Sequence, residues 1–346
     1  DAVVKVLKCN WLTQGPAVET FENALKNYFG ANHACAVSNG TAALHLTGLA
    51  LGWQPDDIVI TSPITFLATA NCIVYAGATP DFVDIDPVTY TIDPNLVEEK
   101  VKSYQSKGKK VKAIIGVDYS GHPCDWKSLR EIADKYDLQL VNDNCHALGA
   151  TYLNDKQYAV KYADLVIQSY HPVKHLTTGE GGAILTNNSD FDEKVRRLRT
   201  HGMTKDPNLM EANDGPWYYE MHEVGFNYRI TDFQCALGLS QLKKLDSGEK
   251  LQTAISYPIQ IWEFNGELLM VFLAGEVVVD FAHRLKNELD HNRLWINAYS
   301  NDLPCYIPSV RILNEGGYEG KDAMIYFDRP TYFRPEVEEL IISAVH

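Results

Sequence analysis

The sequence predicts an α/β fold with a doubly wound, mostly parallel seven-stranded sheet, followed by an atypical α+β segment at the C-terminal end. Two observations predict the sheet. Short β-rich runs alternate with helical patterns between residues 34 and 185, and several of these runs are apolar on both faces. Strands buried between two helical layers have this character. A third observation, a change in the pattern of residues at positions 246–250, marks the start of the C-terminal segment.

Each element of the sheet region has its own signal along the chain. The expected strands cover residues 34–37, 58–61, 81–85, 113–119, 139–143, 165–169 and 182–185. The expected helices between them cover residues 41–51, 66–76, 94–103, 126–136 and 190–200. This regular alternation is typical of a parallel sheet whose ligands bind at the carboxyl ends of its strands.

One more helix is expected to close the first part of the chain. Residues 204–229 form an aromatic, irregular stretch, after which Thr231 opens the helix. Gln234 lies three residues on and completes a capping box, and apolar positions continue to Leu245. The first residues of the chain read as a helix already under way, so we expect the natural start to be missing.

The C-terminal segment, residues 247–346, has a different pattern. The string IWEFNGELLMVFLAG indicates a β-hairpin, because Asn265-Gly266 suits a tight turn. A helix over 277–289 and a strand over 293–298 are expected next, and the remainder is rich in loops. We therefore divide the chain into two domains, 1–246 and 247–346.

Composition narrows the class of protein. The 346 residues include 31 Lys and Arg against 45 Asp and Glu, a net charge of −14 that argues against nucleic acid or an anionic membrane as partner. Hydrophobic residues make up 45%, enough for a core. The seven cysteines form no CxxC pair, which indicates neither a disulfide framework nor a zinc site and favours a cytoplasmic protein. No apolar run is long enough to predict a membrane-spanning helix.

The strongest local signal is QSYHPVKHLTTGEGGAILT, residues 168–186, in which Lys174 follows a buried strand. A lone lysine in a loop is usually only a surface residue. At the carboxyl end of a strand in a doubly wound sheet, however, a desolvated lysine can form a Schiff base with a carbonyl. Lys174 is therefore a candidate catalytic residue.

A second signal is VNDNCHALGA, in which Asp143 ends another buried strand and His146 follows it. Asp143 could simply cap a helix, but an unpaired carboxylate at such a position is costly. The functional alternative is an ion pair to a protonated ring nitrogen, as pyridoxal cofactors require. Without a cofactor, His146 reads as a packed or capping histidine.

A third signal is SNGTAALHL, where a strand passes into a helix that starts near Thr41. The free N–H groups and the dipole of such a start suit an anion, although most starts of this kind are plain caps. Phe66 begins the next helix and could stack on a flat ring or belong to the core.

Taken in order, eight blocks between residues 13 and 246 resemble the DegT/DnrJ-type nucleotide-sugar aminotransferases, a branch of the fold-type I pyridoxal-phosphate (PLP) enzymes. The blocks are TQGPAVETFE, SNGTAALHL, SPITFLATAN, DFVDID, VNDNCHALGA, SYHPVKHLTTGEGGA, RTHG and FNYRITDFQCALGLSQLKKLD. They are most similar to the subgroup that aminates the 4-keto carbon of a UDP-linked 4-keto-6-deoxy-N-acetyl sugar in pseudaminic acid biosynthesis. The resemblance implies PLP, a UDP-sugar and an amino-acid donor, L-glutamate in the family.

The resemblance also implies residue roles. Lys174 would bind PLP covalently and later carry the proton, and Asp143 would keep the pyridine nitrogen protonated. His146 would lie near the phenolic oxygen of the cofactor, and Phe66 would stack on its ring. The remaining implied residues are Thr41, Ala42 and Ser169 for the phosphate, Asn227 for the phosphate of the neighbouring subunit of a homodimer, and Tyr228 and Arg229 for substrate.

From about residue 261 the chain resembles a different family, the later part of the catalytic domain of the zinc-dependent neutral ceramidases. The strings are MVFLAGEVVVDFAHRLKNEL, LWINAYSNDLPCYIPS and EGGYEG. In that family a Glu and a Tyr help to bind zinc, which corresponds here to Glu276 and Tyr306. Catalytic zinc usually needs about three protein ligands, so we expect no metal site, and Glu276 would simply start a helix.

Two alternatives to a sugar aminotransferase therefore follow from the sequence. One is a zinc-dependent N-acyl amidase with Glu276 as a ligand. The other is a catalytically inactive hybrid that keeps only the PLP-binding fold.

Overall fold

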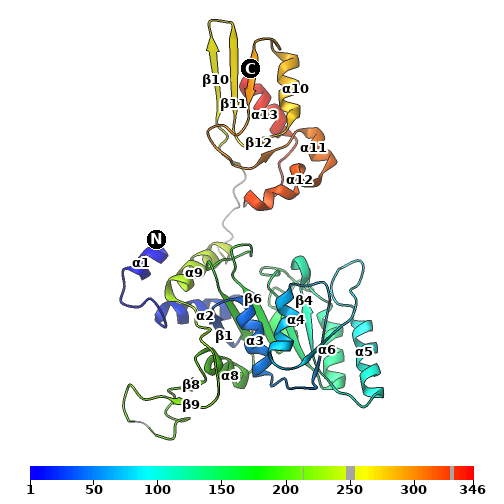
Figure 1. Ribbon diagram of the computed structural model, residues 1–346, viewed down its shortest axis with the longest axis vertical. Coiled ribbons are helices and arrows are strands. Elements are labelled where there is room, and N and C mark those ends of the chain that lie inside the picture. Colours follow the sequence, from blue (N-terminus) through cyan, green and yellow to red (C-terminus); the bar gives the residue numbers. More distant parts are fainter. Residues whose placement is uncertain (213, 247–253, 328–330) are drawn as a thin grey trace. The chain divides into compact units, whose positions relative to one another are not determined.

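The computed structural model describes residues 1–212, 214–246, 254–327 and 331–346. The chain divides into two compact units, Asp1–Gly248 and Glu249–His346, which we describe separately (Figure 1). The predicted assignment of the second unit to a ceramidase-like fragment stays a prediction.

The first unit is built on a seven-stranded sheet in the order β1-β7-β6-β5-β4-β2-β3. Its strands are β1 (His33–Val37), β2 (Ile58–Thr61), β3 (Thr79–Phe82), β4 (Val111–Val117), β5 (Gln139–Asp143), β6 (Leu165–Ser169) and β7 (Gly182–Thr186). All neighbours pair in parallel except β7, which is antiparallel to both β1 and β6. The predicted mostly parallel, seven-stranded sheet is confirmed.

Two strands differ from the predicted bounds by more than one residue. The third covers residues 79–82 rather than 81–85, because Asp86 turns the chain: its carboxylate accepts the N–H groups of Val88 and Thr89. The fourth ends at Val117 rather than at residue 119, because the side chain of Asp118 turns inward and the next residues form a 3-10 turn, η1 (Tyr119–Gly121).

The helices of this unit are α1 (Ala2–Leu7), α2 (Pro16–Phe29), α3 (Gly40–Ala50), α4 (Leu67–Tyr75), α5 (Pro94–Ser106), α6 (Trp126–Tyr136), α7 (Tyr158–Tyr162), α8 (Ser189–Arg199) and α9 (Asp232–Asp246), and a short pair β8 (Met203–Thr204) and β9 (Glu220–Met221) follows α8. The six helices of this unit whose starts were predicted, α3, α4, α5, α6, α8 and α9, begin within one residue of those starts. Asn39, Asp93, Asp125 and Asn188 each accept a first-turn N–H and so explain four of these starts. At α9, the Gln234 side chain accepts the Thr231 N–H at 3.1 Å, which is one half of the predicted capping box.

Apolar side chains pack on both faces of the sheet. Successive residues of β1 alternate between two clusters: Ala34 lies with Phe21 of α2 and Trp126 of α6, whereas Cys35 lies with Leu46 of α3 and other apolar residues of α4 and α8. The sheet is therefore covered on both sides, as a doubly wound fold requires.

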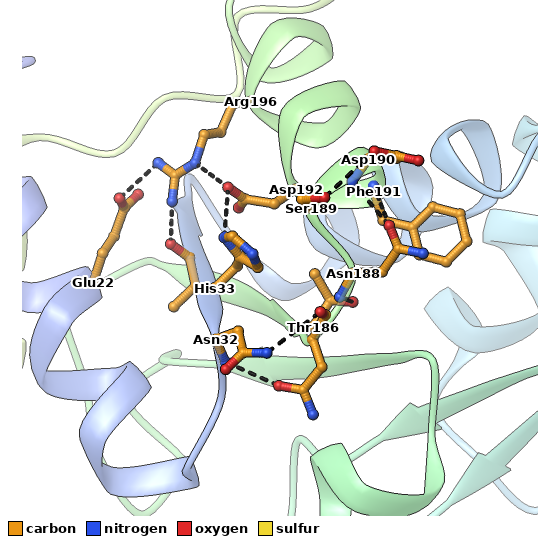
Figure 2. Close-up of polar contacts among 12 residues, drawn as sticks. Glu22, Asn32, His33, Thr186, Asn188, Ser189, Asp190, Phe191, Asp192 and Arg196 are labelled. Atoms are coloured by element: carbon orange, nitrogen blue, oxygen red, sulfur yellow. Dashed lines mark hydrogen bonds and ion pairs between the residues drawn. The ribbon is translucent and has the colours of Figure 1, made fainter.

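A polar network fixes the edge of this sheet. Arg196 of α8 donates to buried Glu22 of α2 at 2.8 Å, to Asp192 at 2.8 Å and to the backbone carbonyl of Ala34 in β1. Figure 2 shows these contacts, together with the 3.4 Å approach of His33 to Asp192. Because Glu22 is paired and hydrogen-bonded, its burial is tolerated, and the edge strand is held against two helices.

The second unit is a small α+β unit. It contains a three-stranded sheet of β10 (Ile259–Phe264), β11 (Leu268–Leu273) and β13 (Leu294–Asn297), a pair β12 (Glu276–Val277) and β14 (Tyr306–Ile307), helices α10 (Val279–Glu288), α11 (Val310–Glu315), α12 (Gly317–Gly320) and α13 (Glu336–Val345), and a 3-10 turn η2 (Asp322–Phe327). The predicted hairpin is confirmed: residues 265–267 join β10 and β11, and Asn265 and Gly266 have positive φ of 47° and 70°. In the described parts of both units, no helix is long and apolar enough to cross a membrane.

Candidate active site

A cavity of about 650 Å³ opens where β5 and β6 end and α3 begins. Eight of the residues singled out from the sequence line it: Thr41, Ala42, Phe66, Asp143, His146, Ser169, Lys174 and Tyr228. They come from segments that lie up to 187 positions apart, and the sheet topology brings their strand ends to one edge. This cavity is the candidate site.

Lys174 lies on a loop that leaves β6 and returns in β7. The loop closes on itself, because the carbonyl of Tyr170 accepts the N–H of Thr178 at 3.0 Å and the hydroxyl of Thr177 at 2.9 Å. The Lys174 N–H donates to the carbonyl of His171 within the loop at 2.9 Å. The paired threonines of the motif therefore hold the segment that presents the lysine to the cavity.

Asp143 is 5% exposed at the end of β5 and has no lysine or arginine partner among the ion pairs of the described residues. Its Oδ2 accepts the hydroxyl of Thr69 in α4 at 2.7 Å, and its Oδ1 accepts the N–H of Cys145 at 3.3 Å. Thr65 lies 2.8 Å from the Thr69 hydroxyl and completes the chain of hydroxyls. A buried carboxylate held by neutral donors is available to a cationic group that enters the cavity.

The first turn of α3 forms another wall. The side chain of Asn39 accepts the Ala42 N–H at 2.7 Å, and its carbonyl accepts the Ala43 N–H at 3.1 Å. The Ala42 N–H, expected to bind phosphate, thus already has a partner in the protein. The Thr41 N–H precedes these groups in a turn whose first N–H groups lack intrahelical partners, so it is suited to an anion.

Two glycines allow this turn to approach β6 and β7 closely. A Cβ at Gly40 would lie 2.9 Å from the Cβ of Ser169 and 3.2 Å from its hydroxyl. A Cβ at Gly182 would lie 2.6 Å from the backbone of Asn39. The Ser169 hydroxyl and the start of α3 can therefore serve one anion together.

His146 and Phe66 line the cavity in different environments. His146 is half-buried, and burial together with the positive charge of Lys174 lowers its pKa below the ordinary value. The neutral imidazole is therefore favoured at neutral pH. Phe66 caps the start of α4 and is 67% exposed, so it is not a core residue.

The structure adds residues that the sequence did not single out. Asn39, Cys145, His171 and Glu180 also line the cavity, and Thr69 holds Asp143 from behind. Only some of these residues could have been found from the sequence. His171 and Glu180, for example, flank Lys174 within the same motif. Thr69, in contrast, sits inside a helix and carries no local signal.

Two predicted residues lie outside this cavity. Asn227 is exposed and pairs with Thr200 through a single β-bridge. Arg229 lines a separate cavity of about 750 Å³ beside Arg196 and Arg199. Within one chain, the structure therefore does not bring Asn227 or Arg229 to Lys174.

A buried polar network lies next to the cavity. Asp118, which is fully buried, accepts hydrogen bonds of 2.7–2.9 Å from the Cys124 N–H, the Trp126 indole, the Asn144 amide and the Tyr158 hydroxyl. Its own N–H donates to the carbonyl of Asp143 at 3.1 Å. Burial raises the pKa of Asp118. The network joins the ends of β4 and β5 and so supports the position of Asp143.

In the second unit, the two residues expected to correspond to ceramidase zinc ligands are neighbours. Glu276 in β12 and Tyr306 in β14 are register partners. The expectation that Glu276 starts a helix is wrong, because it lies in a strand and α10 begins only at Val279. Within the described ranges, no group of three or more His, Cys, Asp and Glu residues could hold a metal ion.

Comparisons with known proteins agree with the geometry of the first unit. The model of the DegT/DnrJ/EryC1/StrS aminotransferase family matches residues 1–266. A UDP-4-amino-4,6-dideoxy-N-acetyl-beta-L-altrosamine transaminase of Campylobacter jejuni is 42% identical over 247 residues, which are 71% of this chain and 61% of that protein.

Two solved structures are similar to 71% of this chain. PseC of Helicobacter pylori, an aminotransferase involved in the biosynthesis of pseudaminic acid, has a TM-score of 0.62 and 35% identity, and 62% of it is covered. NtdA of Bacillus subtilis, with its cofactor PMP bound, has a TM-score of 0.61 and 32% identity, and 52% of it is covered. The chain thus spans less than two thirds of the length of each of these three proteins.

Proposed function

The chain belongs to the DegT/DnrJ/EryC1/StrS aminotransferase family, and on this premise we propose that it aminates the 4-keto carbon of a UDP-linked 4-keto-6-deoxy-N-acetyl-hexose. The amino group would come from an amino acid, with L-glutamate as the expected donor. The similarity to the Campylobacter jejuni transaminase and to PseC supports this substrate class.

The observation that carries the proposal is the convergence of Lys174, Asp143 and Ser169 on one cavity beside the start of α3. Enzymes of this family depend on PLP, and the residues present fit that group. A buried carboxylate suits its ring nitrogen, and a hydroxyl beside a helix start suits its phosphate. The space beside Ser169 that a Cβ at Gly40 would fill is left open.

The roles of the side chains follow from this fit. Asp143, oriented by Thr69, would hold the proton on the ring nitrogen. Ser169 and the Thr41 N–H would bind the phosphate, Phe66 would cover one face of the ring, and His146 would lie near its phenolic oxygen. When bound, PLP withdraws electrons from the α-carbon of the amino donor and makes its proton acidic.

Lys174 would transfer the protons in the reaction. Its Nζ would hold the cofactor at rest, and as a free amine it would take the proton from the α-carbon of the donor and deliver it to the cofactor. The same amine would move the proton in the opposite direction when the sugar ketone is aminated. Because one cavity serves both substrates in turn, we expect ping-pong kinetics.

A homodimer is part of the proposal. Asn227 is exposed and lies away from the cavity of its own chain, which suits a residue that reaches the phosphate in the neighbouring subunit. Tyr228, next in sequence, lines its own cavity and would contact substrate. Arg229 would contact substrate through its separate cavity or across the dimer. We also propose a cytoplasmic location, because the seven cysteines are scattered along the sequence and form no CxxC pair.

The experiment that tests the proposal begins with the absorption spectrum of the purified chain with added PLP, before and after borohydride reduction, followed by peptide mapping. We expect a visible band that reduction fixes on Lys174. The Lys174→Ala variant should lose the band, and Lys109→Ala, which changes an exposed lysine outside the cavity, should keep it.

The lysine that carries the borohydride-reduced cofactor shows where the cofactor binds. An activity assay then tests the reaction. With L-glutamate and a UDP-4-keto-6-deoxy-N-acetyl-hexose, the wild-type chain should form the 4-amino sugar, and Lys174→Ala should not. Label spread over several lysines would contradict the assigned site. If the reduced cofactor were found on Lys174 alone but no sugar were aminated, the assigned cofactor site would stand and the proposed substrate would be wrong.

A further inference from the structure

His171 and Glu180 lie opposite each other at the base of the loop that carries Lys174. Strands β6 and β7 are paired up to the start of this loop. One further backbone hydrogen bond of 2.8 Å joins the residue just before His171 to the residue just after Glu180. Both His171 and Glu180 line the cavity. The strand pairing therefore places an imidazole and a carboxylate side by side at the wall that presents the lysine.

A backbone hydrogen bond decides where the imidazole of His171 carries its proton. The N–H of Val173 donates to Nδ1 of His171 at 3.3 Å. A backbone N–H can only donate, so Nδ1 is the acceptor and carries no proton. The proton of the neutral ring is therefore on Nε2. This nitrogen is a donor, and it lies 4.0 Å from Oε1 of Glu180.

The backbone of Glu180 is fixed by its own loop and by the start of α9. Its carbonyl accepts the hydroxyl of Thr178 at 2.7 Å and the side-chain amide of Gln234 at 2.7 Å. Thr178 is buried, and the Gln234 side chain also accepts the N–H of Thr231 at the start of the helix. The carboxylate of Glu180 is thus carried by backbone that does not need to rearrange when a ligand binds.

The gap of 4.0 Å between Nε2 and Oε1 is too long for a direct hydrogen bond and suits a bridging atom. An oxygen about 2.8 Å from both groups would see them at an angle of about 90°, which a hydroxyl satisfies by accepting from Nε2 and donating to the carboxylate. Among the described residues, no hydrogen bond occupies Nε2 of His171 or the carboxylate of Glu180. Both groups are therefore available to a ligand.

The pair discriminates between the groups that a keto sugar or L-glutamate offers. A carbonyl only accepts, so it would leave the carboxylate of Glu180 without a donor. An ammonium or amide N–H only donates, so it would leave the Nε2 proton of His171 without an acceptor. A second carboxylate would be repelled by Glu180. A hydroxyl is the one group among these that satisfies both partners with a single atom.

From this geometry we propose that His171 and Glu180 form a binding site for one hydroxyl of the sugar, beside Lys174. The inference rests on the proposed function, because it takes the sugar of that reaction as the ligand. In that sugar C1 carries UDP, C4 is the keto carbon, C5 bears the ring oxygen and C6 has no hydroxyl. Of C2 and C3, one carries the acetamido group and the other the only hydroxyl of the hexose. The loop that carries the reacting amine thus also holds the sugar near the carbon to be aminated.

The test is equilibrium binding, which does not require turnover. The chain is loaded with PMP, which does not react with an amino sugar. The probes are the expected product, a UDP-linked 4-amino-4,6-dideoxy-N-acetyl-hexose, and the same compound without its ring hydroxyl. Calorimetry of the wild type should show about 10- to 100-fold weaker binding of the second probe, the effect of two lost hydrogen bonds, one of them to a charged group.

Substitutions then assign this difference to the pair. His171→Phe removes the donor and Glu180→Met removes the acceptor, and both positions are exposed, so the fold should tolerate the changes. The difference between the two probes should shrink in each single variant and disappear in the double variant.

Conservative variants and a matched control complete the series. His171→Gln places an amide N–H near the position of Nε2, and Glu180→Gln keeps an oxygen acceptor, so each should retain most of the difference. Glu99→Met changes an exposed glutamate outside the cavity and should bind both probes as the wild type does.

The outcomes separate this inference from the proposed function. Equal binding of the two probes by the wild type, or a difference that persists in the double variant, would overturn the hydroxyl site even if the chain aminates the sugar. The expected pattern of binding in a chain that aminates no keto sugar would support the hydroxyl site and reject the proposed reaction. A wild-type chain that binds neither probe would overturn both.

Discussion

The hydroxyl of Thr69 donates a 2.7 Å hydrogen bond to the carboxylate of Asp143, from a helix onto the end of a buried strand. Since Thr69 has a single proton to give, the 2.8 Å contact with Thr65 is a hydrogen bond that Thr65 donates. The carboxylate expected to hold the cofactor ring is therefore oriented by two hydroxyls, one from Thr69 in α4 and one from Thr65 just before that helix.

This relationship predicts the effect of Thr69→Val, which keeps the shape of the side chain and removes the hydroxyl. A hydrogen bond to a charged group contributes about 1.5–3 kcal/mol, so we expect the dissociation constant of PLP to rise by roughly 10- to 100-fold. Titration of the visible band measures it. Thr69→Ser should bind PLP nearly as the wild type does, and equal affinity in Thr69→Val would show that Asp143 needs no such support.

Gly40→Ala should disturb the anion site through packing alone. The new Cβ would lie 2.9 Å from the Cβ of Ser169, so the turn must shift. We expect a loss of about 1–3 kcal/mol in unfolding free energy, the usual cost of overpacking, together with weaker PLP binding. Urea unfolding and the same titration measure the two effects.

A second substitution, Ser169→Gly, tests whether the contact between the new Cβ and Ser169 causes the loss of stability. It removes the Cβ that the alanine would meet, so the double variant should regain stability relative to Gly40→Ala. The double variant should not regain affinity for PLP, because it lacks the Ser169 hydroxyl. A double variant as unstable as the single one would mean that the contact is not the source of the loss.

Acid should destabilise the first unit when no cofactor is bound. Burial lowers the pKa values of His45, His146 and His175 in the folded chain. As the pH falls below about 6.5, the unfolded chain binds protons that the folded chain does not, so the unfolding free energy decreases until the pH reaches the lower folded values.

Urea unfolding at pH 7.5 and pH 5.5 measures this decrease. The variant His146→Gln/His175→Gln should show a smaller difference between the two pH values than the wild type. If the variant and the wild type lose the same free energy, other groups dominate the acid response.

Asn227 provides a test of the shared site. Lys174→Ala and Asn227→Ala should each have little activity as homodimers. When they are mixed and allowed to exchange subunits, each heterodimer contains one site with both residues intact, so about one quarter of the wild-type activity should return. If Asn227 served its own chain, no site in the mixture would be complete and the activity would stay low.

Much of the fold could be read from the sequence because it depends on local patterns. The strands 58–61, 139–143 and 165–169 were predicted with their observed bounds, since each is a short apolar run between polar residues. Lys174 and Asp143 could be singled out for the same reason: they follow such runs, and strand ends in this topology meet at one edge.

Other parts depend on contacts that no local pattern records. Asp118 looks like the end of a strand, yet it receives hydrogen bonds from residues up to 40 positions away, which end the strand early. The orientation of Asp143 depends on Thr69, 74 positions before it. Arg229 follows Tyr228 in the sequence, but it lines a different cavity.

The loop between β6 and β7 has a consequence for competition at the site. Ser169 and Gly182 are register partners, so the segment that carries Lys174 begins and ends at the same place. A tether this short keeps its amine at an effective concentration on the order of millimolar, whether or not the amine is bonded. In the proposed reaction, an amino acid from solution would have to displace this tethered amine, which never diffuses away. The binding energy of the carboxylate and side chain of the amino acid would then favour the displacement.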